Sequence, residues 1–236
     1  SHTINPLAIT VANAAVNDKV YDGGTTATVA NGIAQGVLPV DASNISLTPS
    51  ASFTSANAGA AVPVNLAYSL SGTAAGNYVI TQPSGLTATI TPKTLTITGQ
   101  TGSSKVYDAT TSATLVSSGL TLTGLVTVGS TVDAVSVSAT GVFDTKNVGT
   151  GKTVTLTETI SGADASNYTI TKQGTTTANV TPKALTISGL TSANKTYDGT
   201  TKALASGTAV LQSAQAAGAG TTSDGIAYTG DTVSLS

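Results

Sequence analysis

Apolar and polar residues alternate with a period of two along much of this chain, as in the segment Leu7–Val11. Alternation of this kind is typical of β-strands with one face in a core. Stretches with helical periodicity are absent, and Gly, Asn, Asp and Ser occupy the intervening turns. Between residues 7 and 92 the pattern predicts seven strands: Leu7–Val11, Lys19–Tyr21, Thr26–Ala30, Ile45–Thr48, Val62–Leu70, Tyr78–Thr81 and Leu86–Thr91. We therefore expect an all-β fold.

The pattern repeats three times. A Lys-x-Tyr-Asp motif places Tyr21, Tyr107 and Tyr197 at intervals of 86 and 90 residues. Ahead of each motif, a proline opens an alternating strand, as in Pro92-Lys-Thr-Leu-Thr-Ile. Self-similarity at a fixed period indicates tandem modules. The motif residues that we expect to have a structural role are Tyr21, Asp22, Gly23, Tyr107, Asp108, Tyr197, Asp198 and Gly199.

An Asn-Tyr pair recurs later in the two complete copies, as Asn77-Tyr78 and Asn167-Tyr168. The third copy ends before this landmark. We predict four segments: residues 1–6, the end of a preceding repeat or the remnant of a tag; residues 7–92, a first β-sandwich repeat; residues 93–182, a second; and residues 183–236, an incomplete third. Lacking its closing strands, the third is expected to be mobile or to be ordered by pairing with another chain.

Seven strands in about ninety residues match the size of an immunoglobulin-like sandwich. A parallel β-helix is the alternative, but its repeat is normally much shorter. A Pro-Lys pair joins the last strand of one copy to the first strand of the next, with no Gly/Ser linker. We therefore expect tandem immunoglobulin-like β-sandwich repeats arranged as an elongated rod, each repeat contacting its neighbours in the same chain.

The motif residues suggest local roles. Asp22, Asp108 and Asp198 can accept hydrogen bonds from amides just ahead of them, and Gly23 and Gly199 can adopt a positive φ. The second copy has Ala109 at the glycine position, so we expect no strict demand for a positive φ there. The tyrosine of each Asn-Tyr pair is a candidate tyrosine corner, whose hydroxyl bonds to nearby backbone.

Composition narrows the function classes. Only 8% of residues are charged, and the formal net charge is −2. Nine Lys and Arg residues make no basic stripe, so we expect no nucleic acid partner. No apolar run approaches the roughly 20 residues of a membrane span, so we expect no membrane insertion. Cysteine is absent, which excludes disulfides and thiolate sites.

Catalytic chemistry has few candidate residues. His2 is the only histidine, and Glu158, the only glutamate, aligns with Tyr68 in the first copy. We therefore expect no enzymatic activity, no catalytic residue and no cofactor. Calcium needs six or more oxygen ligands, and one Asp per motif beside a Lys does not supply them, so we expect no metal site. A Lys–Asn isopeptide crosslink would suit a load-bearing protein, but a lysine with its amine in water is the simpler expectation.

These motifs resemble the YDG repeat and the related MBG-type bacterial immunoglobulin-like repeats. The resemblance rests on Tyr-Asp-Gly at 21–23 and 197–199, on Tyr-Asp-Ala at 107–109, on the Pro-Lys-x-Leu-Thr-Ile segments and on the Asn-Tyr pairs. Such repeats occur in large bacterial adhesins, including filamentous-haemagglutinin-like proteins. The resemblance implies an extracellular or cell-surface location and a role in adhesion and biofilm formation.

Three functions remain to be distinguished. The first is a spacer that extends a distal adhesive domain from the cell. The second is a module that itself binds exopolysaccharide or a host surface glycan. The third is an accessory domain of a secreted enzyme. Carbohydrate binders usually present exposed aromatic rings, and this chain has no Trp, seven Tyr and two Phe, which favours the spacer.

Overall fold

The structure is a computed structural model that describes residues 2–235. This part of the chain consists of strands, turns and three short 3-10 helices, which confirms the predicted all-β fold. The chain divides into two compact units, one of residues 1–97, 122–137 and 160–171, the other of residues 98–121, 138–159 and 172–236. Each unit is described by itself below. Among the described residues, no helix is long and apolar enough to cross a membrane.

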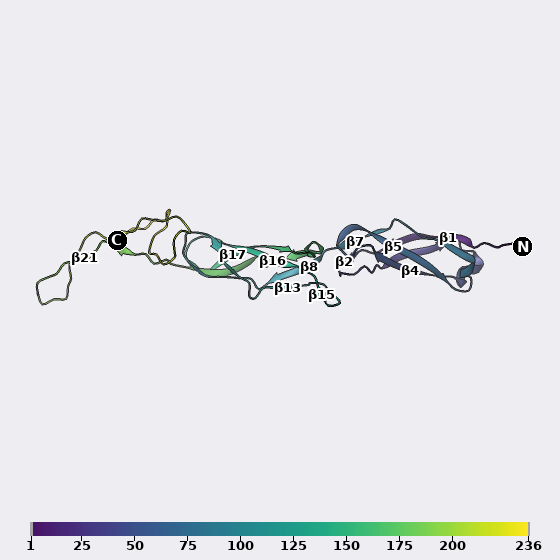
Figure 1. Ribbon diagram of the computed structural model, residues 1–236, viewed down its shortest axis with the longest axis horizontal. Coiled ribbons are helices and arrows are strands. Elements are labelled where there is room, and N and C mark those ends of the chain that lie inside the picture. The colour runs from purple at the N-terminus through teal and green to yellow at the C-terminus, as the bar shows by residue number, and fades with distance from the viewer. Residues whose placement is uncertain (1, 236) are drawn as a thin grey trace. The chain divides into compact units, whose positions relative to one another are not determined.

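The first unit contains two sheets that are formed by the first predicted repeat (Figure 1). The four-stranded sheet has the order β2 (Lys19–Val20), β7 (Thr87–Thr91), β5 (Gly59–Ser71), β4 (Ser46–Phe53). The three-stranded sheet has the order β3 (Val29–Gln35), β1 (Leu7–Val16), β6 (Tyr78–Thr81). The β2–β7 and β1–β6 pairs are parallel, and the others are antiparallel. Two 3-10 helices, η1 (Pro39–Asn44) and η2 (Ala75–Asn77), lie between strands.

Strand β5 shows why these residues form a sheet over a core. Its alternate side chains are buried from Val62 to Tyr68, while the residues between them are exposed. Phe53 of β4 lies opposite Val64 in the antiparallel register, so both add to the same apolar layer. The period of two in the sequence is therefore the period of burial in the structure.

The core of the first unit also includes residues from the second predicted repeat. Leu95, Val126 and Tyr168 pack in one cluster with Tyr21, Phe53 and four buried residues of β5 and β7. Leu95 lies on β8 (Lys93–Thr98), which pairs in parallel with β18 (Tyr168–Thr171) and also borders β13 (Thr121–Thr123). Val126 precedes the hairpin of β14 (Thr127–Val128) and β15 (Thr131–Val132), and η3 (Ala165–Asn167) precedes β18. Apolar packing is therefore continuous across residues 92 and 93.

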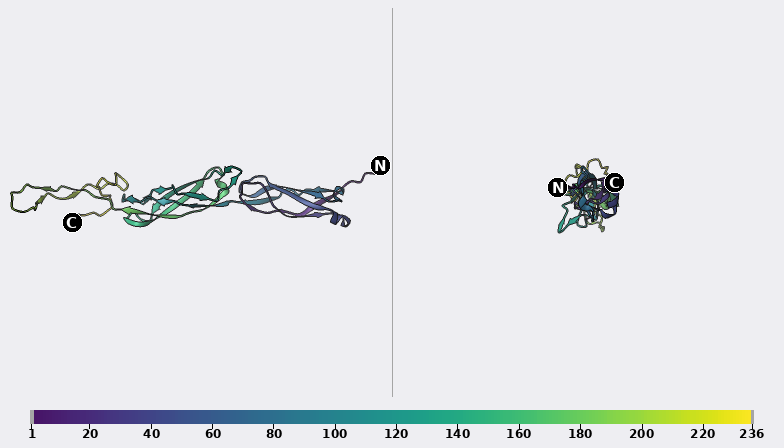
Figure 2. Two further views of the ribbon diagram at one scale, coloured as in Figure 1. Left: turned by 90° about the horizontal axis from the view of Figure 1, so that it is seen from below. Right: turned by 90° about the vertical axis from the view of Figure 1, so that its right-hand side faces the viewer.

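The second unit is built mainly on a five-stranded sheet (Figure 2). Its order is β10 (Lys105–Val106), β19 (Thr175–Thr181), β17 (Gly149–Ser161), β16 (Ser136–Phe143), β11 (Ser112–Ala113). A two-stranded ladder of β9 (Thr101–Gly102) and β12 (Leu115–Val116) accompanies it. The core of this unit is a cluster around Phe143, with Val154 and Leu156 from β17 and Ala178 and Val180 from β19.

Residues 183–235 form only short pairings within the second unit. Strand β20 (Ile187–Ser188) pairs with β23 (Val210–Leu211), and β21 (Thr191–Ser192) pairs with β22 (Ala205–Ser206). Tyr228 is buried, and the Lys183 amine lies 4.1 Å from its ring centre and 2.7 Å from Asp224. This segment therefore has one anchored region, around Lys183 and Tyr228, and long exposed stretches.

The strands predicted for residues 7–92 are present, with one clear displacement. The strand predicted at Thr26–Ala30 lies instead at Val29–Gln35, where it pairs with β1, while Thr26 makes only an isolated bridge to Ser52. The segment is rich in Ala, Gly and Asn, whose weak strand preference leaves pairing to tertiary context. Gly32 illustrates that context, because a Cβ there would lie 2.1 Å from the Tyr68 hydroxyl. The proposed repeat boundaries stay predictions.

Candidate functional site: tyrosine–aspartate joints between repeats

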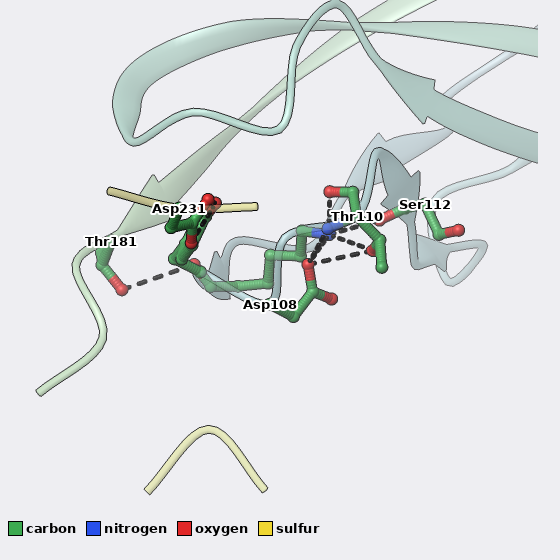
Figure 3. Close-up of polar contacts among 7 residues, drawn as sticks. Asp108, Thr110, Ser112, Thr181 and Asp231 are labelled. Atoms are coloured by element: carbon green, nitrogen blue, oxygen red, sulfur yellow. Dashed lines mark hydrogen bonds and ion pairs between the residues drawn. The ribbon is translucent and has the colours of Figure 1, made fainter. Parts of the chain in front are cut away.

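The Lys-x-Tyr-Asp motif folds into a compact turn. In the second copy, the Lys105 amine lies 2.7 Å from Asp108 Oδ1, and the same oxygen accepts the Thr110 amide at 2.9 Å. The amine also donates to the carbonyl oxygens of Thr110 and Ser112, both at 2.9 Å (Figure 3). Burial alone would raise the pKa of Asp108, but the bonds from Lys105 and Thr110 outweigh it and lower this pKa. The turn is therefore closed by a charge-assisted network.

The other two copies form the same turn. The ion pairs are Lys19–Asp22 at 2.7 Å and Lys195–Asp198 at 2.8 Å. In each turn the Asp also accepts, at 2.9 Å, the amide two residues ahead, as the sequence predicted. The Lys195 bond lowers the pKa of Asp198. The motif is thus a local structure that forms in all three settings.

The residue after the Asp has a positive φ in every copy: 75° at Gly23, 61° at Ala109 and 71° at Gly199. The expectation that Ala109 relaxes this requirement is therefore wrong. The turn must bend back so that the carboxylate reaches the next amide, and this needs left-handed backbone whichever residue is present. An alanine in this region is strained, because its Cβ approaches the following carbonyl.

The motif lysine packs on a phenylalanine. Lys19 Nζ lies 5.4 Å from the centre of the Phe53 ring, and Lys105 Nζ lies 5.4 Å from that of Phe143. The amine is thus held between an aromatic face and a carboxylate, rather than in water as we expected. None of the hydrogen bonds of Lys19 and Lys105 goes to an asparagine, so the Lys–Asn arrangement of an isopeptide crosslink is not formed by these residues.

The motif tyrosine makes the contact that the sequence did not reveal. In the first unit, the Tyr21 hydroxyl donates to Asp133 Oδ2 at 2.8 Å, and Tyr168 donates to the same oxygen. The Tyr21 and Tyr168 rings meet edge to face, with centres 5.4 Å apart and an interplanar angle of 79°. A bond from the Tyr21 amide to the Thr91 carbonyl orients the motif. We call the set Tyr21, Asp133 and Tyr168 the first joint.

The first joint perturbs both phenols. Burial and the hydrogen bond to Asp133 raise the pKa of Tyr168 to about 12. The same two causes, burial first, raise the pKa of Tyr21 well above its ordinary value of 10.0. Both hydroxyls therefore stay protonated as hydrogen-bond donors to the carboxylate at any physiological pH.

The second unit contains a contact of the same kind. The Tyr107 hydroxyl donates to the Asp231 carboxylate, whose two oxygens lie 2.7 Å and 2.8 Å from it. Lys146 adds an ion pair to Asp231 at 2.8 Å, and its amine lies 5.8 Å from the Tyr107 ring centre. Here the edge-to-face partner of Tyr107 is Tyr228, at 5.9 Å and 68°. We call the set Tyr107, Lys146, Asp231 and Tyr228 the second joint.

The acceptor carboxylates occupy equivalent positions. The Asp133 amide donates to the Val126 carbonyl at 3.1 Å, and the Asp231 amide donates to the Tyr228 carbonyl at 3.2 Å. The repeat motifs do not point to either aspartate or to Lys146. A signal was present, because Asp133 and Asp231 each open the sequence Asp-x-Val-Ser, but it falls in loops of different length.

The Asn-Tyr pair of the second copy also belongs to the first joint. Asn167, 2% exposed, accepts the Ala58 amide on Oδ1 at 2.9 Å, and its Nδ2 lies 3.5 Å from Asn57 Oδ1. The Tyr168 hydroxyl accepts the Val126 amide at 2.9 Å. The predicted tyrosine corner is thus a backbone contact, but across 42 residues rather than nearby.

The remaining predicted residues lie elsewhere. Tyr78 is buried, its hydroxyl accepting the Leu38 amide at 3.2 Å and donating to Asp41 at 2.8 Å, whereas Asn77 is exposed. Tyr197 is 93% exposed. The structure therefore brings the motif tyrosine and the Asn-Tyr pair together in the first joint. Among the described residues, neither Tyr78 nor Tyr197 packs against a partner tyrosine in this way.

Outside the joints, the described residues include one buried glutamate. Glu158 is buried in β17, where one oxygen accepts the Gly174 amide at 3.1 Å. Within residues 2–235 there is no group of three or more His, Cys, Asp or Glu side chains placed to hold a metal ion. The chemistry that the structure does present is hydrogen bonding between phenols and carboxylates.

Comparison with known proteins agrees with the repeat pattern. The family described as YDG domain matches the sequence three times, over residues 5–85, 91–178 and 181–236. Searches of curated proteins and of solved structures found no match.

Proposed function

We propose, from the premise that this chain belongs to the YDG domain family, that its repeats are non-enzymatic stalk or spacer modules. In this proposal they belong to a bacterial surface or secreted adhesin of the filamentous-haemagglutinin-like kind. They extend a distal adhesive domain from the cell during adhesion and biofilm formation. The tandem immunoglobulin-like rod and the extracellular location are parts of the same proposal.

The recurring joint is the observation that carries this proposal. Tyr21 and Asp133 come from consecutive predicted repeats, and so do Tyr107 and Asp231. A spacer has to transmit force from one module to the next, which needs defined contacts at each boundary. A hydrogen bond to a charged acceptor contributes roughly 1.5–3 kcal/mol. Two independent copies of one contact indicate that the contact serves the array rather than one module.

The joint also supports stiffness between modules. Thr91 and Lys93 are separated only by Pro92, so the last strand of one predicted repeat leads directly into the first strand of the next. Pro92 removes one backbone donor and restricts φ, which limits bending at this residue. Together with buried Tyr21 and Asn167, these features favour a spacer over flexibly linked binding domains.

The alternative is a module that itself binds exopolysaccharide or a host glycan. Stacking on sugars requires accessible aromatic rings. Six of the seven tyrosines and both phenylalanines are buried or partly buried, and Tyr197 alone is highly exposed. A single exposed ring supports this alternative less well than it supports the spacer.

A glycan array probed with the whole chain separates the two functions. We expect no binding to bacterial exopolysaccharides or host glycans. Micromolar binding to one polysaccharide class would favour the binding module, and loss of that binding in Tyr197→Ala would locate it.

Small-angle X-ray scattering of the whole chain tests the mechanical part. A spacer predicts an extended particle that becomes more flexible when Asp133→Ala and Asp231→Ala are combined. Asp198→Ala, which alters a turn outside both joints, is the matched control and should leave the profile unchanged. A compact, globular profile of the unmodified chain would refute the spacer.

A further inference from the structure

The first predicted repeat has a surface that matches the acceptor side of the joints. Its residues are Leu38, Asp41, Asn77 and Tyr78, and we call them the socket. The Asp41 amide donates to the Leu38 carbonyl at 2.9 Å, the same backbone bond that Asp133 and Asp231 make. The socket therefore has the backbone of a joint acceptor.

Side-chain contacts extend this equivalence. The Tyr78 hydroxyl accepts the Leu38 amide and donates to Asp41, as the Tyr168 hydroxyl does with Val126 and Asp133. Asn77 precedes Tyr78 as Asn167 precedes Tyr168, and each asparagine ends a 3-10 helix. The carboxylate and the phenol that contact Tyr21 in the first joint thus have counterparts in the socket.

The difference lies in what covers these groups. Val126 and Tyr228 are 6% and 2% exposed in the joints, whereas their counterpart Leu38 is 49% exposed. Asn167 is buried against Ala58, whereas Asn77 is exposed. Burial in the joints comes from a motif tyrosine and its neighbouring loop, so an exposed Leu38 and Asn77 are what an acceptor shows before docking.

A cleft at the socket provides room for a ring. Besides the four socket residues it is lined by Gly76 and by residues 4–7, and Leu7 is exposed together with Leu38. Apolar side chains around a carboxylate suit a phenol, which has an apolar ring and a polar hydroxyl. Tyr78, buried below Leu38, corresponds to the ring of Tyr168 that meets Tyr21 edge to face.

The same chain carries a matching donor. The turn that holds Tyr197 is fully formed, with the Lys195–Asp198 ion pair at 2.8 Å and a φ of 71° at Gly199. Tyr197 itself is 93% exposed and makes none of the hydroxyl bonds that Tyr21 and Tyr107 make. It is thus a preformed donor turn.

We propose that the socket is a docking site for the Tyr197 turn of a second copy of this chain. In the complex, the Tyr197 hydroxyl donates to Asp41, its ring meets Tyr78, and Leu38 becomes buried. The contact is heterologous, because the two copies use different surfaces, so it can add further copies head to tail. This inference rests on the geometry of the joints and does not require the stalk function.

The contact between two copies should be weaker than the joints within one chain. Within one chain, the joints form at the high effective concentration that covalent linkage provides. Between chains the same tyrosine docks without that advantage. We therefore expect weak association, visible at high protein concentration or after trapping.

Cysteine trapping is a direct test, because the chain has no native cysteine. In the first joint, a Cβ at Gly23 would lie 2.5 Å from Val128 Cγ2. The corresponding intermolecular pair is Gly199 and Val40, since Val40 follows Leu38 as Val128 follows Val126. Val40 is 77% exposed and available for a disulfide.

The experiment mixes Val40→Cys and Gly199→Cys chains of different mass under mild oxidation. We expect the mixed disulfide to form faster than the mixed disulfide of Val40→Cys with Leu204→Cys, an exposed cysteine outside the motif. The double variant Gly23→Cys/Val128→Cys, which should close within one chain, is the positive control. Equal rates for the Gly199 and Leu204 partners would overturn the proposal.

Sedimentation equilibrium of the cysteine-free chain provides an independent measurement. We expect the average mass to rise with concentration, and Tyr197→Phe to weaken association roughly tenfold or more, the loss of a hydrogen bond to a carboxylate. Asp41→Asn should act in the same direction. A chain that stays monomeric at every concentration, or variants that associate like the parent chain, would overturn the docking site and leave the glycan-array result untouched.

Discussion

Tyr21 and Asp133 are 112 residues apart in the chain, yet the tyrosine hydroxyl lies 2.8 Å from the carboxylate oxygen. Tyr21 belongs to the turn that defines the repeat, and Asp133 belongs to a loop whose length differs between copies. The contact therefore joins the most regular feature of the sequence to one of its least regular features. Its recurrence at Tyr107 and Asp231 makes it the contact most worth testing by substitution.

The Tyr21→Phe variant should reduce the free energy of unfolding by about 1–2 kcal/mol. The variant keeps the buried ring but removes one of the two hydroxyl donors to Asp133. Because Tyr168 still donates to this carboxylate, the loss of unfolding free energy should lie toward the lower end of the range for hydrogen bonds to charged groups. Denaturant unfolding in dilute solution measures it. Tyr197→Phe is the matched control, because a highly exposed tyrosine should change stability by less than about 0.5 kcal/mol. Equal effects of the two changes would contradict the first joint.

Ala109→Gly should stabilise the chain by about 0.5–1 kcal/mol. The alanine has a φ of 61°, and glycine relieves the steric cost there, although it adds freedom to the unfolded state. Thermal or denaturant unfolding of the single variant measures the gain. A loss of stability would mean that Ala109 tolerates this backbone without strain.

The reverse changes at the other two turns separate backbone strain from packing. A Cβ at Gly199 would meet no atom within 4 Å, so Gly199→Ala should lower the free energy of unfolding only through backbone strain, by about 1 kcal/mol. Gly23→Ala places a Cβ 2.5 Å from Val128 Cγ2, so it should cost clearly more. The same unfolding measurements apply, and equal costs would indicate that Gly23 and Val128 do not pack as described.

Asn167→Ala should destabilise the chain by about 1–3 kcal/mol. The substitution leaves the Ala58 amide without its acceptor in a partly buried site. Asn77→Ala, at the exposed counterpart position, is the matched control and should be nearly neutral. Hydrogen exchange at the Ala58 amide provides a local readout, since it should accelerate in Asn167→Ala alone. Unchanged exchange there would argue against this contact.

Alkaline pH should destabilise the first joint. Burial and Asp133 raise the pKa of Tyr168 from 10.0 to about 12 and raise the pKa of Tyr21 as well. A raised pKa in the folded state means that the unfolded chain loses these protons first. The stability that the two protonated phenols contribute is therefore fully present below pH 10 and is lost as the pH rises toward 12.

Unfolding measured between pH 8 and 12, in steps of about one pH unit, tests this dependence. Ultraviolet absorbance reports tyrosinate formation, which for an unperturbed tyrosine is centred near a pKa of about 10. In Tyr21→Phe the loss of stability with rising pH should be shallower. A profile that is flat up to pH 12 would show that the two phenols do not bond to the Asp133 carboxylate.

The local features of this protein could be predicted from its sequence with good success. The strands at Tyr78–Thr81 and Leu86–Thr91 are present within one residue, because alternation of apolar and polar residues follows directly from the geometry of a strand. The Asp22 turn was also predicted, since its bonds join residues close in the chain. The positive φ of Ala109 is not evident from the sequence, because alanine ordinarily avoids left-handed backbone and only the bonds of the folded turn require it.

What the sequence by itself determined is therefore the all-β class, the phase of the repeat and the turn around each motif aspartate. Those features depend on neighbours in the chain and on the period of a strand. Only the tertiary structure decided which carboxylate receives each motif tyrosine, which asparagine is buried, and why Tyr21 and Tyr197 differ despite sharing a motif. The reason is that such contacts join residues more than 100 positions apart, across loops of different length, where no local pattern records the partner.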